Sequence, residues 1–357
     1  MNIPSDKSTK NSVFQNRKYW YIAAKSTKLK KKPIRVTLWN EPLVLFRDSQ
    51  GTPHALLDRC PHRNVPLSSG TVQKNHIQCP YHGWEFNGTG QCTHIPGRVQ
   101  DNSSPTRNVL SFPVIEQQGY IWVYTDSEST PNHEPYLFPF LEEKGYRSIH
   151  YQADFDANLL ATAENVLDVP HTAFLHKGLF RSGNRNLIEA HISRYAHKAE
   201  CSYVGEPRPS GLLGSLLAPK GGEVEHFDRF ILPSIAQVEY RLGKQQLMST
   251  SFLTPISDFV TRMYAVVSVR LNFVVPGLQT IVTPFALRIV QQDIEMLKQQ
   301  TEQVQFFGGE NYSYTELDVL APSIRRLLKR ANEQPLALYQ EAEEEAPEHT
   351  SSTQLMV

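Results

Sequence analysis

The sequence predicts an α+β protein whose N-terminal part is all-β. Residues 19–124 consist of short apolar runs that alternate with turn signals, which is typical of an all-β domain. Residues 156–176, 285–304 and 323–334 have helical spacing instead, and strand-like runs lie between the first two. The 357 residues are enough for two domains.

Changes in composition along the chain give the domain boundaries. Residues 15–125 form the predicted all-β domain, in which glycine-containing stretches such as FNGTGQC allow the positive φ of hairpin turns. Residues 126–146, rich in Ser, Thr, Pro and charge, are the predicted linker. Residues 147–335 mix strand and helix patterns and form the predicted second domain. Residues 336–357 include the acidic stretch EAEEEAPEHTSSTQ, which predicts a disordered, solvated tail.

Charge and hydropathy exclude several classes of protein. Lys plus Arg and Asp plus Glu both number 36, so the net charge gives no sign of a nucleic-acid-binding surface. Without a run of 18 apolar residues or a secretory signal, the chain is expected to be cytoplasmic and to have no membrane span. The most apolar stretch, residues 271–290, is interrupted by Pro276, Gly277 and Pro284, which predicts strand, turn and strand.

Two of the four cysteines lie close to histidines in CPHRNVPLSSGTVQKNHIQCPYHGW (60–84). Cys60 and His62 form one pair, and Cys79 and His82 form the other. Two thiolates and two imidazoles can hold either a tetrahedral zinc ion or a [2Fe-2S] cluster with mixed ligands, and the pattern alone leaves both open. Each pair carries one ligand of each kind, which favours a Rieske cluster, where the cysteines hold one iron and the histidines the other.

The stretch ENVLDVPHTAFLH (164–176) carries a second group of possible ligands. His171 and His176, with one carboxylate, can form the facial triad that binds Fe(II) and leaves positions open for O₂ and substrate. On a straight helix the two histidines lie about 140° apart, so both reach one metal only if the helix bends near Pro170. The alternative is a pair of unrelated histidines on a helix.

The third ligand is expected from the helix predicted over residues 285–304. Asp293 falls in line with Ala286, Val290 and Leu297 at helical spacing, which places it on an apolar, inward face. Glu295 lies about 200° away on the same helix and is expected to face solvent. Asp293 is therefore the predicted ligand, with Glu295 as the alternative.

Both motifs resemble those of a known family. CPHRNVPLSSG and IQCPYHGWEF are similar to the Rieske domain of the Rieske non-haem iron oxygenases, and Asp168, His171 and His176 match the family's Asp-x₂-His-x₄-His motif. The resemblance implies a [2Fe-2S] cluster and a mononuclear Fe(II) held by His171, His176 and Asp293. It also implies that Asp168 links an iron-ligating histidine to a cluster histidine of the neighbouring subunit, with Asn165 supporting the iron site. The implied second domain is a helix-grip-like antiparallel sheet with helices.

The function implied by the resemblance is that of a terminal oxygenase. Such an enzyme uses O₂ to hydroxylate, demethylate or desaturate an apolar, ring-containing small molecule, and the family implies a homotrimer. The chain has neither a nucleotide-binding Gly-x-Gly-x-x-Gly after a strand nor a plant-type ferredoxin motif, so electrons from NAD(P)H must arrive through a separate reductase, a ferredoxin or both. The alternatives are a ring cis-dihydroxylating dioxygenase, a Rieske electron-transfer protein without oxygenase activity, and a zinc-stabilised lipid-binding module.

Overall fold

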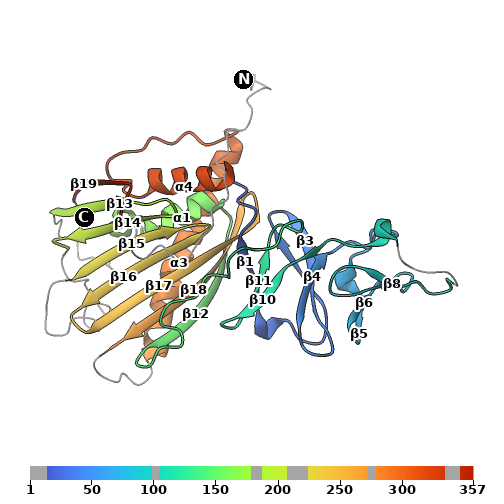
Figure 1. The fold of residues 1–357 in the computed structure, drawn as a ribbon. Helices are drawn as coiled ribbons and strands as arrows, with labels where there is room; N and C mark the ends of the chain where they lie inside the picture. The colour runs from blue at the N-terminus through green and yellow to red at the C-terminus, as the bar shows by residue number, and fades with distance from the viewer. Residues whose placement is uncertain are drawn as a thin grey trace. The chain divides into compact units, whose positions relative to one another are not determined.

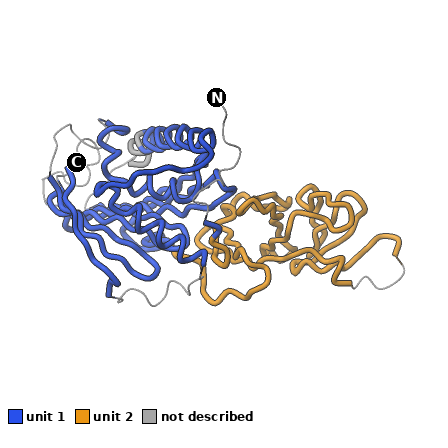
Figure 2. Tube along the Cα trace, turned by 90° about the horizontal axis from the view of Figure 1, so that it is seen from above, with its two compact units in different colours: residues 1–15, 138–357 blue, residues 16–137 orange. Residues whose placement is uncertain are grey.

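The computed structural model of the protein describes residues 14–98, 104–177, 187–206, 224–271, 278–333 and 346–356. The chain divides into two compact units, an N-terminal unit of residues 16–137 and a C-terminal unit of residues 1–15 and 138–357 (Figure 2). The boundary after residue 137 lies inside the predicted linker, residues 126–146, so part of that segment belongs to each unit. Within the described residues, no helix is long and apolar enough to cross a membrane.

The described part of the N-terminal unit contains three antiparallel sheets (Figure 1). The three-stranded sheet has the order β1 (Trp20–Lys25), β11 (Tyr120–Tyr124) and β10 (Val114–Gln117). One four-stranded sheet has the order β2 (Ile34–Leu38), β3 (Glu41–Arg47), β4 (Pro53–Leu57) and β9 (Ser111–Phe112). The other has the order β5 (Thr71–Gln73), β6 (His76–Gln78), β7 (Glu85–Phe86) and β8 (Cys92–His94). The predicted all-β character of this part is confirmed.

The turn between β7 and β8 shows why the sequence folds locally as it does. Asn87 accepts hydrogen bonds through its side chain from the backbone N–H groups of Thr89, at 3.1 Å, and Gln91, at 2.9 Å. Gly90 has a φ of 79°, a conformation that costs residues with a Cβ atom. A Cβ atom at Gly90 would lie 1.9 Å from the carbonyl oxygen of Val109, so only glycine fits this turn. The hairpin predicted from FNGTGQC is confirmed.

The C-terminal unit is built on one eight-stranded antiparallel sheet (Figure 1). Its order is β12 (Arg147–Phe155), β18 (Val260–Arg270), β17 (Gln245–Ser257), β16 (Ile235–Leu242), β15 (Glu225–Ile231), β14 (Lys198–Val204), β13 (Leu187–Arg194) and β19 (His349–Met356). In the described part of this unit, three helices accompany it, namely α1 (Leu159–Leu167), α3 (Leu278–Phe306) and α4 (Ala321–Glu333). Helix α1 contacts the central strands β15 to β18, α3 contacts β12, and α4 contacts β14. An antiparallel sheet with helices was the predicted architecture, and it is confirmed.

Two predictions, one of a helix and one of a strand–turn–strand segment, need correction. Helix α1 ends at Leu167 instead of running to residue 176, because Pro170 has no N–H to donate in a continuing helix. Residues 278–290 belong to α3, which contains Pro284, so the strand–turn–strand prediction for residues 271–290 was wrong. Only Leu271 and the helix are described there. The helix predicted over 323–334 is confirmed as α4.

A disordered tail was predicted over residues 336–357, of which residues 336–345 and 357 lie outside the described residues, and the described part differs from that prediction. His349–Met356 forms β19, which pairs in antiparallel register with β13 along all eight of its residues. The strand anchors itself through Leu355, which is fully buried, while Glu348 just before it pairs with Arg330 at 3.2 Å. The acidic composition of this segment did not indicate a strand. The strand forms because β19 pairs with the backbone N–H and C=O groups along one edge of β13.

Candidate metal sites

Cys60 and Cys79 each begin a loop with the same backbone hydrogen bonds. In the first loop, the Cys60 N–H donates to the Val65 carbonyl at 3.0 Å and the Cys60 carbonyl accepts from the Asn64 N–H at 2.8 Å. The fifth loop residue, Asn64, has a φ of 62°. The chain thereby reverses direction within six residues, and His62 lies in this turn.

The second loop repeats this pattern nineteen residues later in the sequence. The Cys79 N–H donates to the Trp84 carbonyl at 2.8 Å, and the Cys79 carbonyl accepts from the Gly83 N–H at 3.1 Å. Gly83, again the fifth residue, has a φ of 70°. The two loops are therefore structural copies that each present one cysteine and one histidine.

The two cysteine side chains lie next to each other, and so do the two histidine side chains. The Cys60 and Cys79 side chains are buried and interact with each other, and the rings of His62 and His82 lie 4.5 Å apart. The His62 ring also stacks on Trp84, at 4.9 Å and an interplanar angle of 5°. A pair of thiols beside a pair of imidazoles is the donor arrangement of a cluster in which one iron takes sulfur and the other nitrogen.

Two further observations fit a bound cluster. The Nδ1 atom of His62 is buried and has no hydrogen-bond partner in the described part of the chain, as expected of a nitrogen kept for a metal. Burial and the neighbouring Cys79 thiol raise the pKa of the Cys60 thiol to about 11. A metal must therefore supply the charge that stabilises the thiolate in this buried place.

The other two cysteines lie outside the two loops, Cys92 on β8 and Cys201 on β14. Both are buried, as is common for free cysteines. Burial is the main reason that the pKa of each of these two thiols is raised.

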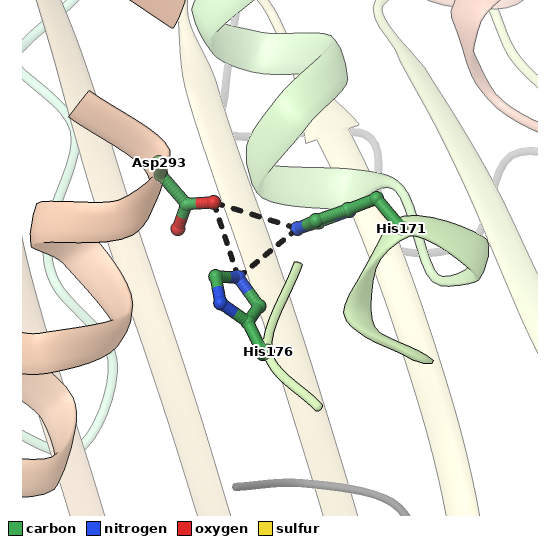
Figure 3. A group of neighbouring side chains, drawn as sticks. All are labelled: His171, His176 and Asp293. Carbon is green, nitrogen blue, oxygen red and sulfur yellow. Dashed lines mark hydrogen bonds and ion pairs between the residues drawn. The ribbon is translucent and has the colours of Figure 1, made fainter. Parts of the chain in front are cut away.

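A second group of side chains meets in the C-terminal unit (Figure 3). His176 Nε2 lies 3.1 Å from Asp293 Oδ1, and His171 Nε2 lies 3.5 Å from the same oxygen. The two Nε2 atoms are 3.2 Å apart. Three potential ligand atoms thus converge on one point, two from the segment after α1 and one from α3, in the pattern of two histidines and one carboxylate that suits Fe(II).

The early end of α1 explains how both histidines reach that point. Asp168 leaves the helix with a φ of −88° and a ψ of 115°, and Pro170–Ala173 then forms the short 3-10 turn η4. His171 lies on this turn and His176 lies three residues beyond it. The bend expected near Pro170 is therefore a change from α-helix to a 3-10 turn.

Asp168 orients His171. Its Oδ2 atom accepts the backbone N–H of His171 at 3.0 Å and lies 3.0 Å from Nδ1 of the same residue. With its proton on Nδ1, the imidazole turns the lone pair of Nε2 toward Asp293 and His176. Burial opposes a positive charge on His171, but the two carboxylates of Asp168 and Asp293 outweigh it and raise its pKa to about 9.

Gln292 does the same for His176, a role that the sequence analysis did not predict. Its Oε1 atom lies 3.0 Å from Nδ1 of His176, whose side chain is almost fully buried. Gln292 immediately precedes Asp293, and it stands among several glutamines that periodicity alone does not separate.

Asn165 and Glu295 fall where the sequence predicted. The Asn165 amide donates to Asp293 Oδ1 at 3.3 Å. Glu295 is exposed and accepts a hydrogen bond from Gln299 at 3.0 Å, away from the histidines. Hydrogen bonds from His171 and His176 lower the pKa of Asp293 although burial works in the opposite direction, so this carboxyl group is held as the anion. The apolar face expected around Asp293 holds in part, because Leu297 is buried but Ala286 is exposed.

Comparison with known families agrees with both sites. The Rieske [2Fe-2S] domain family matches residues 19–113, which include both cysteine loops. The family described as the vanillate O-demethylase oxygenase C-terminal domain matches residues 155–334, which include His171, His176 and Asp293.

Individual relatives cover most of the chain. The oxygenase component of dicamba O-demethylase from Stenotrophomonas maltophilia is 28% identical over 84% of this chain and 78% of its own length. The oxygenase subunit of 3-chlorobenzoate-3,4-dioxygenase from Comamonas testosteroni is 30% identical over 70% of this chain and 58% of its own length. Among solved structures, dicamba monooxygenase bound to 3,6-dichlorosalicylic acid superimposes with a TM-score of 0.76 at 25% identity, over 89% of this chain and 98% of that one.

Proposed function

Since this chain belongs to the Rieske non-haem iron oxygenases, we propose that its two metal sites form the electron store and the reaction centre of a terminal oxygenase. The observation that carries the proposal is the convergence of His171, His176 and Asp293 in a chain that also has the paired Cys and His loops. An electron carrier needs only the loops. The second site is what an oxygenase adds.

We assign the [2Fe-2S] cluster to the two copied loops. Cys60 and Cys79 hold one iron, and His62 and His82 hold the other. This assignment is supported by the adjacent thiols, the adjacent rings and the His62 Nδ1 atom, which has no hydrogen-bond partner among the residues that the structure describes. The tetrahedral zinc alternative would use the same four side chains, and the match to the Rieske domain family favours the cluster.

We assign the mononuclear iron to His171, His176 and Asp293. Ferrous iron in such a triad keeps positions open for O₂ and, with electrons from the cluster, supplies the oxidising chemistry. The protein's own part is to hold the ligands in place. Asp168 fixes the tautomer of His171, and Asn165 donates to the ligand oxygen of Asp293.

The substrate we propose is an aromatic small molecule, and the reaction inserts one oxygen atom, as in hydroxylation or demethylation. The vanillate O-demethylase family match over residues 155–334 supports one-oxygen chemistry. The names dicamba O-demethylase and toluene-4-sulfonate monooxygenase, borne by relatives, point the same way. The relative named 3-chlorobenzoate-3,4-dioxygenase keeps dihydroxylation as the second candidate.

We further propose that electrons come from a separate reductase or ferredoxin and that the enzyme is a homotrimer. Relatives are named as an oxygenase component and as an iron-sulfur subunit of a monooxygenase system, which supports a separate donor. Asp168 supports the oligomer. Its side chain is one-third exposed, and among the described residues only its Oδ2 atom is engaged, which leaves Oδ1 for a cluster histidine of the neighbouring subunit.

Iron analysis of matched variants tests the assignment of the second site. Asp293→Ala should lower the iron content from about three to about two atoms per chain and leave two acid-labile sulfides. Glu295→Ala, on the exposed side of the same helix, should keep all three iron atoms. If both variants retain three, Asp293 is not a ligand; if the native protein holds only two, the chain is an electron carrier.

Product analysis tests the reaction. With ¹⁸O₂ and a surrogate reductase, a panel of methoxylated and carboxylated aromatic compounds should yield a demethylated or singly hydroxylated product. Incorporation of two labelled atoms into one ring would establish the dioxygenase alternative instead.

A further inference from the structure

We propose that Gln292 is a positioning residue for the iron site and that its neutral side chain holds His176 by accepting a hydrogen bond from the ring. The inference rests on the proposed function, because it concerns the residues assigned to the mononuclear iron. It adds a residue outside the predicted ligand motifs. It also explains why the amide of Gln292 contacts Nδ1 of His176, whereas the carboxylate of Asp168 contacts Nδ1 of His171.

The geometry of His176 carries the first step. Its side chain is 1% exposed, and helix α3 contacts both of its nitrogens. Asp293 Oδ1 lies 3.1 Å from Nε2, and Gln292 Oε1 lies 3.0 Å from Nδ1. Two consecutive residues of one helix therefore fix the ring, one on the metal side and one behind it.

The chemistry of the amide carries the second step. With Oε1 facing the ring, Nδ1 must carry the proton, and the lone pair of Nε2 is free to bind a metal. The opposite orientation would place an amide N–H against Nδ1 and force the proton onto Nε2. That proton would face His171 Nε2, 3.2 Å away, and would prevent both histidines from sharing an ion. Only the accepting orientation is consistent with a metal site.

The charge of the site carries the third step. His171 is oriented by the carboxylate of Asp168, while His176 is oriented by the uncharged Gln292. Asp168 and Asp293 together bring two negative charges, which balance the two positive charges of Fe(II). A third carboxylate behind His176 would make the site anionic, and the ferric state would be favoured over the ferrous state. Gln292 thus supplies the hydrogen bond of a carboxylate without its charge.

Metal affinity tests the hydrogen bond. Gln292→Leu should weaken Fe(II) binding about 10- to 100-fold, measured anaerobically by competition with a ferrous chelator. Gln291→Leu is the matched control, because Gln291 is the exposed neighbour on the same helix, and its affinity should equal that of the native protein. Far-ultraviolet circular dichroism, to which the sheet and helices of the C-terminal unit contribute, reports that each variant is folded.

Gln292→Glu tests the charge. The carboxylate can still accept from His176, so Fe(II) affinity should be at least that of the native protein, while the potential of the mononuclear iron should fall. The high-spin ferric EPR signal, followed in a redox titration, measures that potential. Native affinity in Gln292→Leu, or an unchanged or higher potential in Gln292→Glu, would overturn the inference. Absence of a third iron from the native protein would instead defeat the proposed function.

Discussion

At the scale of single residues, the iron site depends on side chains that orient ligands. Asp168 accepts two hydrogen bonds with one carboxylate oxygen, and both come from His171. Removing this support leaves a ligand that can still reach the metal but rotates more freely. Loss of Asp168 should therefore impair the orientation of His171 and electron transfer to the iron more than it weakens metal binding.

Asp168→Ala should keep the cluster and the mononuclear iron while the rate of product formation falls at least about 10- to 100-fold. Iron and sulfide analysis verifies the metal content, and product formation under saturating reductase measures the rate. Glu295→Gln is the control, since that carboxylate is exposed and accepts a hydrogen bond from Gln299 on the same helix. Native turnover in the Asp168 variant would contradict its role.

At the scale of elements, tight turns hold the cluster-bearing sheets together. Gly90 and Gly97 both have a φ of 79°, but a Cβ atom at Gly90 would meet the Val109 carbonyl at 1.9 Å, and one at Gly97 would meet nothing within 4 Å. Replacing Gly97 by alanine therefore tests the energetic cost of the positive φ alone, whereas replacing Gly90 tests that cost together with a steric clash.

Gly97→Ala should lower the free energy of unfolding of the N-terminal unit by about 1 to 2 kcal/mol, the cost of a left-handed conformation. Gly90→Ala should lower it by about 3 kcal/mol or more, since backbone must also move. Urea unfolding followed by the visible absorbance of the cluster measures both. Equal losses for the two variants would show that the Gly90 turn relaxes without cost.

Strand β19 makes a similar prediction for the C-terminal unit. Leu355→Ala should lower its free energy of unfolding by about 2 to 4 kcal/mol, because the side chain is fully buried. Met356→Ala, one residue further and 57% exposed, should change it by less than about 0.5 kcal/mol. Urea unfolding followed by far-ultraviolet circular dichroism measures the free energy of unfolding of both variants. If Leu355→Ala is as stable as the control, β19 contributes nothing to the unit.

Elements whose hydrophobic pattern extends over many residues were predicted from the sequence. Features that depend on one residue or on a distant contact were not. The inward position of Asp293 was predicted from its helical spacing to Leu297, which is buried, although Ala286 on the same predicted face is exposed. The end of α1, in contrast, depends on the local effect of Pro170. β19 was missed because the acidic residues before it dominate the composition. Gln292 was missed because its partner, His176, is 116 residues away in the sequence and only the fold brings them together.

At the scale of the whole molecule, the proposed trimer predicts that two variants, each inactive alone, restore activity when they assemble together. Cys79→Ser should lack the cluster, and His171→Ala should lack the mononuclear iron. If the cluster of one subunit serves the iron of the next, equal co-expression should restore about a quarter of native activity, because one interface in four then pairs an intact donor with an intact acceptor. Activity that stays at the level of the separate variants would place electron transfer within a single chain.

The central claim is that this one chain stores an electron in a Rieske cluster and uses it at a separate ferrous site. The most direct measurement is metal and sulfide analysis of anaerobically purified protein, combined with EPR after reduction. The account predicts about three iron atoms and two sulfides per chain and a rhombic cluster signal. A colourless zinc protein, or a cluster protein with only two iron atoms after iron loading, would contradict it.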